Sequence, residues 1–93
     1  MQTPRTPATL RYLIAGLVQR AQTLLDRACR EPMPAARMLA ITSTAMRARA
    51  RAAQLQASLN VGQAQPWRAE FDRAMAYMRL ASGFAHAADL RGA

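Results

Sequence analysis

The apolar residues of this chain recur at intervals of three and four positions, which is the spacing of one helix face. Three such stretches occur, and prolines at positions 4, 7, 32, 34 and 66 separate them. No stretch alternates between apolar and polar residues as a half-buried strand would. The pattern therefore predicts an all-α fold with three helices, at about 7–30, 35–59 and 67–90. Together with a flexible lead-in at 1–6, these helices form a single domain spanning 1–93.

The residues at the expected helix ends support these bounds. Thr6 can cap the first helix, and Pro7 can take its first helical position. Asn60 and Gly62 are natural stop residues for the second helix. Pro66 then opens the third helix, because a proline in the first turn lacks only an N–H that has no intrahelical partner.

The connection SLNVGQAQPWR, residues 58–68, admits two interpretations: the turn of a DNA-reading helix-turn-helix, or the loop of a helical hairpin. In a helix-turn-helix, Pro66 would occupy an inward position of the recognition helix, where it removes a backbone donor and clashes with the preceding turn. That helix would also offer no arginine before Arg68, although base contacts come from its start. The stretch therefore predicts a hairpin.

Heptad patterns in the second and third helices favour the same conclusion. One seam contains Met38, Ile41, Ala45, Ala48, Ala52, Leu55 and Leu59; the other contains Trp67, Phe71, Ala74, Met78, Ala81, Ala85 and Ala88. If the chain reverses near Gly62–Gln63, the seams face each other in an antiparallel hairpin. In that register Leu55 faces Phe71 and Ala45 faces Ala81.

Several large apolar residues lie beside these seams, which leaves two interpretations open. In one, an amphipathic first helix closes a three-helix bundle and buries them. In the other, they form an exposed groove for a helix of a partner protein or of a second copy. The best candidates for a partner-binding surface are Leu39, Met46, Tyr77, Leu80 and Phe84, joined by Leu13, Leu17 and Leu24 if the first helix opens.

The charge of the chain is strongly positive, with thirteen basic residues, all of them arginine, against five acidic ones, for a net charge of +8. An all-arginine, alanine-rich composition is typical of GC-rich coding, yet the charge still favours anionic partners. Arg37, Arg47 and Arg51 share one side of the second helix, with Arg49 apart from them. These three arginines predict an alternative function, in which the protein contacts the phosphates of a nucleic acid.

The sequence predicts a non-enzymatic protein without a cofactor or a metal. His86 is the only histidine and has no second catalytic group in a fixed relation to it, and the five carboxylates form no ligand cluster. Cys29 is the only cysteine and cannot form an internal disulfide. No apolar run reaches the roughly 18 residues of a membrane span. We therefore expect a soluble protein of a reducing, bacterial cytoplasm.

The segment PWRAEFDRAMAYMRLASGFA, residues 66–85, resembles the second helix of the small hairpin co-chaperones of bacterial type III secretion needles, the E component. The features they share are a tryptophan that opens the helix, a glutamate three residues later, and an alanine-rich amphipathic run with aromatic residues. The resemblance covers the third helix and, loosely, the hairpin. It implies a cytoplasmic protein that pairs with a larger helical-repeat chaperone and keeps a polymerising needle subunit soluble.

Overall fold

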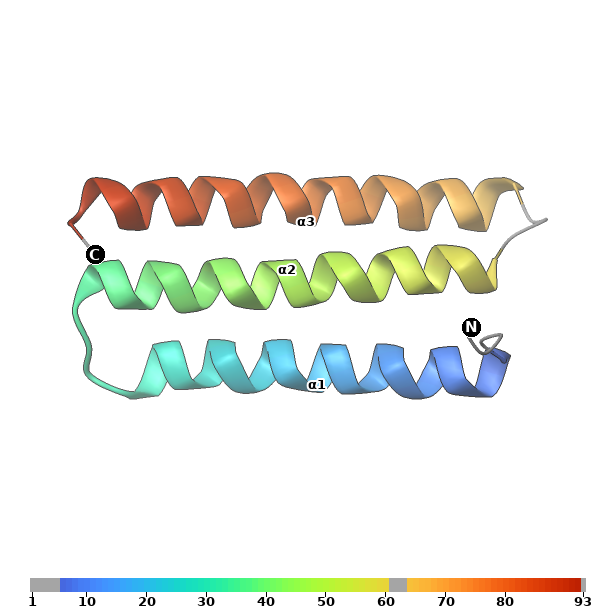
Figure 1. Cartoon of the computed structure of the whole chain (residues 1–93), viewed down its shortest axis with the longest axis horizontal. Coiled ribbons are helices and arrows are strands. Elements are labelled where there is room, and N and C mark those ends of the chain that lie inside the picture. Colours follow the sequence, from blue (N-terminus) through green and yellow to red (C-terminus); the bar gives the residue numbers. More distant parts are fainter. Residues whose placement is uncertain (1–5, 61–63, 93) are drawn as a thin grey trace, which may run out of the picture.

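The computed structural model of the chain describes residues 6–60 and 64–92. It contains three α-helices, namely α1 (Pro7–Arg30), α2 (Ala35–Leu59) and α3 (Ala64–Leu90) (Figure 1). No strand occurs in the described residues, and the predicted all-α hairpin fold is confirmed. The lead-in at 1–5 and the chain reversal at Gly62–Gln63 lie outside the described residues.

The helix ends follow the local sequence. Thr6 caps α1 as predicted: its hydroxyl oxygen accepts a hydrogen bond from the backbone N–H of Thr9 at 3.1 Å, and Pro7 is the first helical residue. α3 begins at Ala64 and not at Trp67, so Pro66 lies inside its first turn. This earlier start removes no hydrogen bond, because the N–H groups of a first turn have no intrahelical acceptors.

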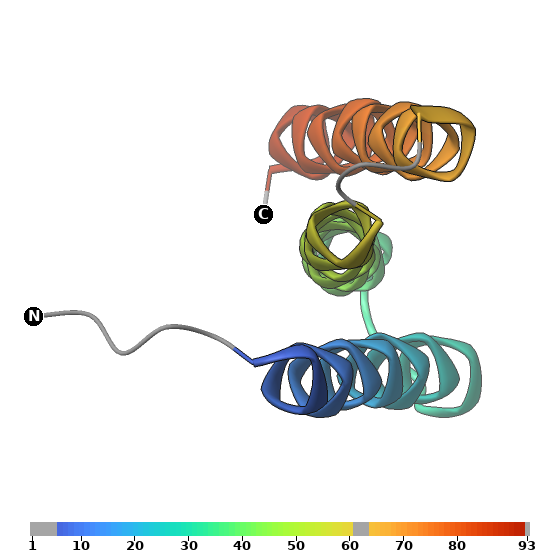
Figure 2. The ribbon, with the colours of Figure 1, turned by 90° about the vertical axis from the view of Figure 1, so that its right-hand side faces the viewer.

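The three helices form a row with α2 in the middle. α1 packs on one side of α2 and α3 on the other, and the described parts of α1 and α3 make no contact with each other. Figure 2 shows this row end on. The interpretation in which the first helix closes a three-helix bundle is therefore wrong. Because α2 is covered on two opposite sides only, two strips of its surface remain open between its neighbours.

The packing of α2 on α3 is antiparallel, but its register differs from the predicted one. The hydroxyl of Ser43 donates a 2.7 Å hydrogen bond to the backbone carbonyl of Ala81, so Ser43 and not Ala45 faces Ala81. Residues two positions apart are rotated by about 200° around a helix axis, so Ser43 and Ala45 lie on opposite sides of α2. The seam continues at heptad intervals through buried Ala50 and Ala57.

The predicted seam of α2 faces α1 instead. Ala45 and Ala48 form a buried cluster with Ala21 of α1, and the partly buried Leu17, Leu24, Leu25 and Met46 pack against it. Leu55 lies one heptad after Ala48 and is also buried. The predicted contact of Leu55 with Phe71 is therefore wrong. The sequence did not separate the two seams, because α2 carries small residues along both sides.

The core consists mainly of alanine. Its buried apolar residues are Leu10, Ala21, Ala28, Ala45, Ala48, Ala50, Ala52, Ala53, Leu55, Ala57, Ala74, Ala81 and Ala88. Small side chains allow helix backbones to approach closely, and the direct hydrogen bond from Ser43 to the α3 backbone shows such an approach. Close packing of backbones thus replaces the interlocking of large side chains.

Gly83 does not take part in this close packing. A Cβ atom added at Gly83 would meet no atom within 4 Å, although the residue lies within α3. Replacing Gly83 by alanine is therefore expected to stabilise the protein by about 0.5–1 kcal/mol, since glycine loses more backbone entropy in a helix. Urea unfolding followed by circular dichroism measures this change.

Gly92 provides a control of opposite sign for that substitution. Its φ of 73° lies in the left-handed region, which side chains disfavour, so Gly92→Ala should not stabilise the chain. A loss of stability in Gly83→Ala would contradict the prediction and would indicate a packing role for this glycine.

Candidate functional site

A groove runs over one of the two open strips of α2 and is lined by all three helices. Its lining residues are Ile14 and Val18 of α1, Arg49, Ala52, Ala53 and Gln56 of α2, and Glu70, Arg73 and Tyr77 of α3; we call it the Tyr77 groove. Its cavity measures about 290 Å³. Its lining combines apolar residues from all three helices with Arg49, Gln56, Glu70 and Arg73, and convergent polar groups beside apolar ones are typical of binding sites.

The polar residues of the Tyr77 groove lie mainly along α3. Glu70 and Arg73 form an ion pair one helical turn apart, with 2.9 Å between the carboxylate and guanidinium atoms. The Glu70 side chain is only 16% exposed, whereas that of Arg73 is 57% exposed. Arg49 of α2 is half-buried and forms no ion pair with any carboxylate of the described residues. The groove therefore presents mixed polar and apolar surface, with an ion pair along its α3 edge.

The predicted partner-binding residues of α2 and α3 lie along this side of the helix row. Tyr77 lines the groove, and Phe84 follows it by one heptad on α3. Met46 and Leu39 precede Ala53 by one and two heptads on α2, so they share its side. Met46 also packs against the core cluster. Leu17 and Leu24 pack against that cluster as well, but from the other flank of α1, and they do not line the groove. Leu80 is the most exposed of the predicted set.

The second open strip of α2 lies on the opposite side and carries arginine. Relative to the seam residue Ala50, the groove residue Ala53 lies on one flank, and Arg47 and Arg51 lie on the other. Arg47 and Arg51 are exposed, and Arg51 donates a 3.3 Å hydrogen bond to the side-chain oxygen of Gln54. Arg37 is exposed as well, whereas Arg49 lines the Tyr77 groove. The predicted separation of Arg49 from the other arginines of the second helix is thus observed.

A row of large apolar residues on α3 borders the same strip. It consists of Trp67, Phe71, Met75 and Met78, which are 39–47% exposed. The rings of Trp67 and Phe71 stack with 5.4 Å between their centroids and 17° between their planes. Tyr77 and Met78 lie on opposite flanks of Ala81, since they precede it by four and three residues. The row therefore lies on the side of Arg47 and Arg51; we call these six residues the arginine face.

Sequence reasoning identified the arginines of the arginine face but missed its apolar row. It placed Trp67, Phe71 and Met78 in the hairpin core, but their exposure shows that they lie at its edge. Only the alanines Ala74, Ala81 and Ala88 of that predicted seam are fully buried. Their exact seven-residue spacing is the signal that could have identified the true contact line.

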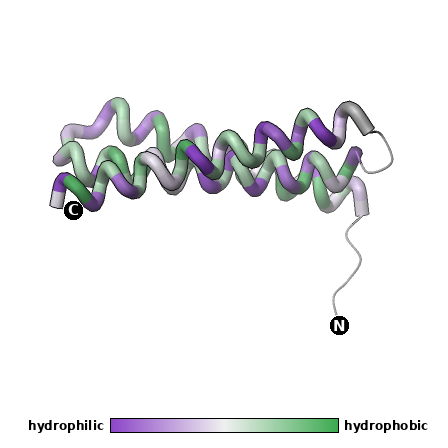
Figure 3. The backbone as a smooth tube through the Cα atoms, turned by 90° about the horizontal axis from the view of Figure 1, so that it is seen from above, coloured by the Kyte–Doolittle hydropathy of each residue, from purple (hydrophilic) through white to green (hydrophobic). Residues whose placement is uncertain are grey.

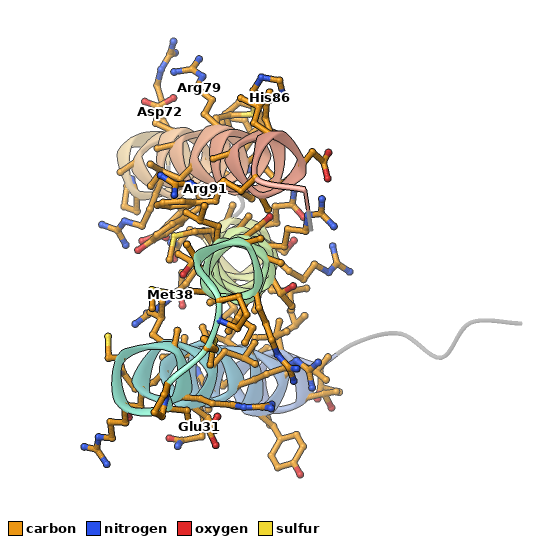
Figure 4. All side chains as sticks on the ribbon, turned by 90° about the vertical axis from the view of Figure 1, so that its left-hand side faces the viewer. Glu31, Met38, Asp72, Arg79, His86 and Arg91 are labelled. Atoms are coloured by element: carbon orange, nitrogen blue, oxygen red, sulfur yellow. The ribbon has the colours of Figure 1, made fainter. Side chains whose placement is uncertain are left out.

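The outer face of α3 is polar and lies away from the other helices. Asp72, Arg79 and His86 follow one another at heptad intervals and point away from α2 (Figure 4). Within residues 6–60 and 64–92, no three histidine, cysteine, aspartate or glutamate side chains gather as a metal site. Cys29 is exposed on α1. We assign no catalytic or metal-binding role to the outer face of α3.

Comparison of the chain with protein-family models, with curated proteins and with solved structures gave no match. None of the described helices combines the length and the apolar character needed to cross a bilayer. Figure 3 shows hydrophilic and hydrophobic residues mixed along every helix. The function therefore has to be argued from the two open sides of α2.

Proposed function

We propose that this protein is a non-enzymatic interaction module that binds a helix of a partner protein along the Tyr77 groove. The observation that carries the proposal is the row of helices itself: α1 and α3 lie on opposite sides of α2 and leave a groove lined by all three. A fourth helix laid over α2 would contact both outer helices. The protein would then act as an adaptor, an assembly factor or a secretion co-chaperone.

The dimensions of the row suit a helix. Packed helices lie about 8–10 Å apart, so α1 and α3 are separated by roughly twice that distance. A helix with its side chains is about 10 Å across and fits between them. Burial of about 600 Å² of apolar surface contributes about 15 kcal/mol, of which association and ordering costs remove most. The remaining free energy would favour binding of the partner helix.

Methionines extend the apolar surface of this groove. Met46 lies on the groove side of α2. Met38, one heptad before Ala45, is partly exposed beside α1 (Figure 4). Thioether side chains are flexible and adapt to different partner surfaces. Their presence favours a groove that accepts a partner helix over a site shaped for one small ligand.

The resemblance of residues 66–85 to type III secretion co-chaperones supplies one version of this proposal. In that version the hairpin of α2 and α3 pairs with a larger helical-repeat chaperone in the cytoplasm. α1 is an additional helix packed on the other side of α2, and Ile14 and Val18 from it complete the groove. The partner helix would therefore contact a surface that a two-helix hairpin alone does not provide.

A second candidate function is the binding of nucleic-acid phosphates. It is favoured by the exposure of Arg37, Arg47 and Arg51 and by the absence of any acidic residue in α2. Phosphate binding releases counterions and weakens steeply as salt rises, whereas apolar contacts do not. The salt dependence of binding thus separates the two candidates.

Replacing Tyr77 by glutamate is expected to weaken partner binding at least tenfold, because it removes an aromatic wall and places a charge in the groove. The measurement is a quantitative pull-down from extract of the source cells, followed by titration of the purified partner. His86→Glu is the matched control, since it adds the same residue to the outer face of α3.

Three outcomes of that experiment carry information. A partner that is lost with Tyr77→Glu and retained with His86→Glu supports the proposal. A partner retained by both variants contradicts it. Light scattering that shows dimers dissociated by Tyr77→Glu would also contradict it, because the groove would then join two copies.

A further inference from the structure

The arginine face is an open surface that the proposed function does not use. It lies on the side of α2 opposite the Tyr77 groove and combines Arg47 and Arg51 with the exposed Trp67, Phe71, Met75 and Met78. Contiguous exposed apolar patches rimmed by polar residues often mark protein interaction sites. Its composition specifies what kind of partner would fit.

The positive charge of this surface is not neutralised within the described residues. Their ion pairs are Arg27 with Glu31 and Arg73 with Glu70, which lie on α1 and α3. α2 contains no acidic residue, and among the residues that the structure describes Arg51 has only the neutral Gln54 as a hydrogen-bond partner. Arg20 of α1 is exposed on the same side, since it lies next to Leu17 and away from Val18. The surface therefore attracts a negatively charged partner.

The spacing of charged and apolar residues on this surface is helical. Arg47 and Arg51 are four residues apart on α2, so they form one row along its axis. Phe71, Met75 and Met78 form a parallel apolar row on α3, and Leu17 and Leu24 lie on the facing flank of α1. A complementary surface thus needs a line of carboxylates with apolar residues beside it, which is the pattern of an acidic amphipathic helix.

We propose that the arginine face binds an acidic amphipathic helix of another protein. Its carboxylates, four residues apart, would meet Arg47 and Arg51, while its apolar residues would cover Phe71, Met75 and Met78. This site is separate from the Tyr77 groove, so the protein can hold one helix on each open side of α2. It would then connect two partners and not merely bind one.

A second copy of the chain does not fit this surface. The net charge is +8, and none of the three helices carries an acidic row. Of the three acidic residues in α3, Glu70 is paired with Arg73 on the opposite side, Asp72 points away from α2, and Asp89 is a single carboxylate two heptads after Met75. Self-association here would bring arginines together.

A nucleic acid fits the surface less well than an acidic helix does. Base stacking needs free ring faces, and Trp67 and Phe71 already cover one face of each other. Met75 and Met78 add apolar area that a phosphate backbone would leave uncovered. An acidic helix uses both the charge and the apolar row.

The test uses a synthetic helical peptide of about three heptads, with glutamates four residues apart flanked by leucines. A peptide of the same composition in shuffled order serves as the reference probe, and a single-stranded uridine oligonucleotide serves as the phosphate probe. Binding to the full chain is measured by calorimetry and mapped by amide chemical shifts. Two charge-reversed proteins are compared, Arg47→Glu with Arg51→Glu, and Arg30→Glu with Arg79→Glu.

The second variant is a matched control, because it changes the net charge by the same amount on outer surfaces. Arg79 points away from α2, and Arg30 lies half a turn from the buried Ala21. The proposal expects the amphipathic peptide to bind at least tenfold more tightly than the shuffled one, with shifts at Met75 and Met78. The Arg47/Arg51 variant should lose about tenfold or more in affinity, and the control less than about twofold.

Each contrary result overturns the proposal in a different way. Equal binding of both peptides, or equal loss in both variants, would show attraction by net charge alone. Tight binding of the oligonucleotide, lost in the Arg47/Arg51 variant, with no binding of the peptide, would identify a phosphate site. Peptide shifts confined to Tyr77 and Ala53 would assign the peptide to the other groove. Neither Arg47 nor Arg51 lines the Tyr77 groove, so failure here leaves the proposed function standing.

Discussion

Replacing Ala81 by leucine is expected to destabilise the protein by about 3 kcal/mol, because the seam between α2 and α3 has no room for a larger side chain. Ala81 is 1% exposed, and its carbonyl oxygen lies 2.7 Å from the hydroxyl of Ser43. A leucine there must push the two backbones apart and break that hydrogen bond. Urea unfolding followed by circular dichroism would show the lower midpoint.

Ala76→Leu is the control for this substitution. Ala76 lies in the same helix but is exposed, so a leucine there should change stability by less than about 0.5 kcal/mol. If both variants unfold at the same urea concentration, the close contact of α2 with α3 is not the main source of stability. The register set by Ser43 would then also be in question.

Replacing Ala21 by aspartate is expected to release α1 from α2 while the hairpin of α2 and α3 stays folded. Ala21 is completely buried at the centre of the cluster with Ala45 and Ala48. Burial of an unpaired carboxylate costs about 3 kcal/mol or more, and this cost falls on the packing of α1 against α2. Since α1 makes no contact with α3 among the described residues, its release leaves the other interface intact.

Hydrogen exchange resolved by residue is the measurement for this second prediction. In Ala21→Asp, amides of α1 should lose protection, whereas those of the seam around Ala50 and Ala74 should keep it. Gln19→Asp adds the same charge at a nearby exposed position of α1 and should leave α1 protected. Loss of protection throughout the Ala21→Asp chain would show that the three helices unfold as one unit.

Much of the fold could be predicted from the sequence, because it depends on local signals. Thr6 and Pro7 determine where α1 begins, and the prolines at 32 and 34 separate it from α2. The antiparallel hairpin followed from the heptads on both sides of residue 62. These signals act over a few residues, so they can be recognised without knowledge of tertiary contacts.

The register and the order of the helices could not be predicted in the same way. Ala45, Ala52 and the opposite Ala50 and Ala57 are equally suited to close packing, and nothing local indicates which side faces α3. Which side of α2 packs against α3 depends on which large residues become exposed at the edge of that interface. Burying the Ala50 side against α3 left Trp67 and Phe71 at the rim, which is a property of the whole arrangement.

The Tyr77 groove was predicted only in part, because it depends on how the three helices are arranged. Tyr77 was identified as a spare apolar residue, and it lines the groove. The contributions of Ile14 and Val18 depend on α1 lying across α2 from α3, which the apolar pattern of α1 does not specify. Arg37, Arg47 and Arg51 were predicted to share one side of α2, but their apolar neighbours on α3 were assigned to the core.

The alanine-rich core has a thermal consequence. Methyl groups bury less apolar surface than leucine or phenylalanine side chains, and no large side chain is completely buried among the described residues. The heat capacity change on unfolding scales with apolar surface exposed, so its value per residue should fall below the usual range of about 12–15 cal/mol/K. A small heat capacity change flattens the dependence of stability on temperature. The molecule would therefore lose its folded form gradually on warming and resist unfolding in the cold.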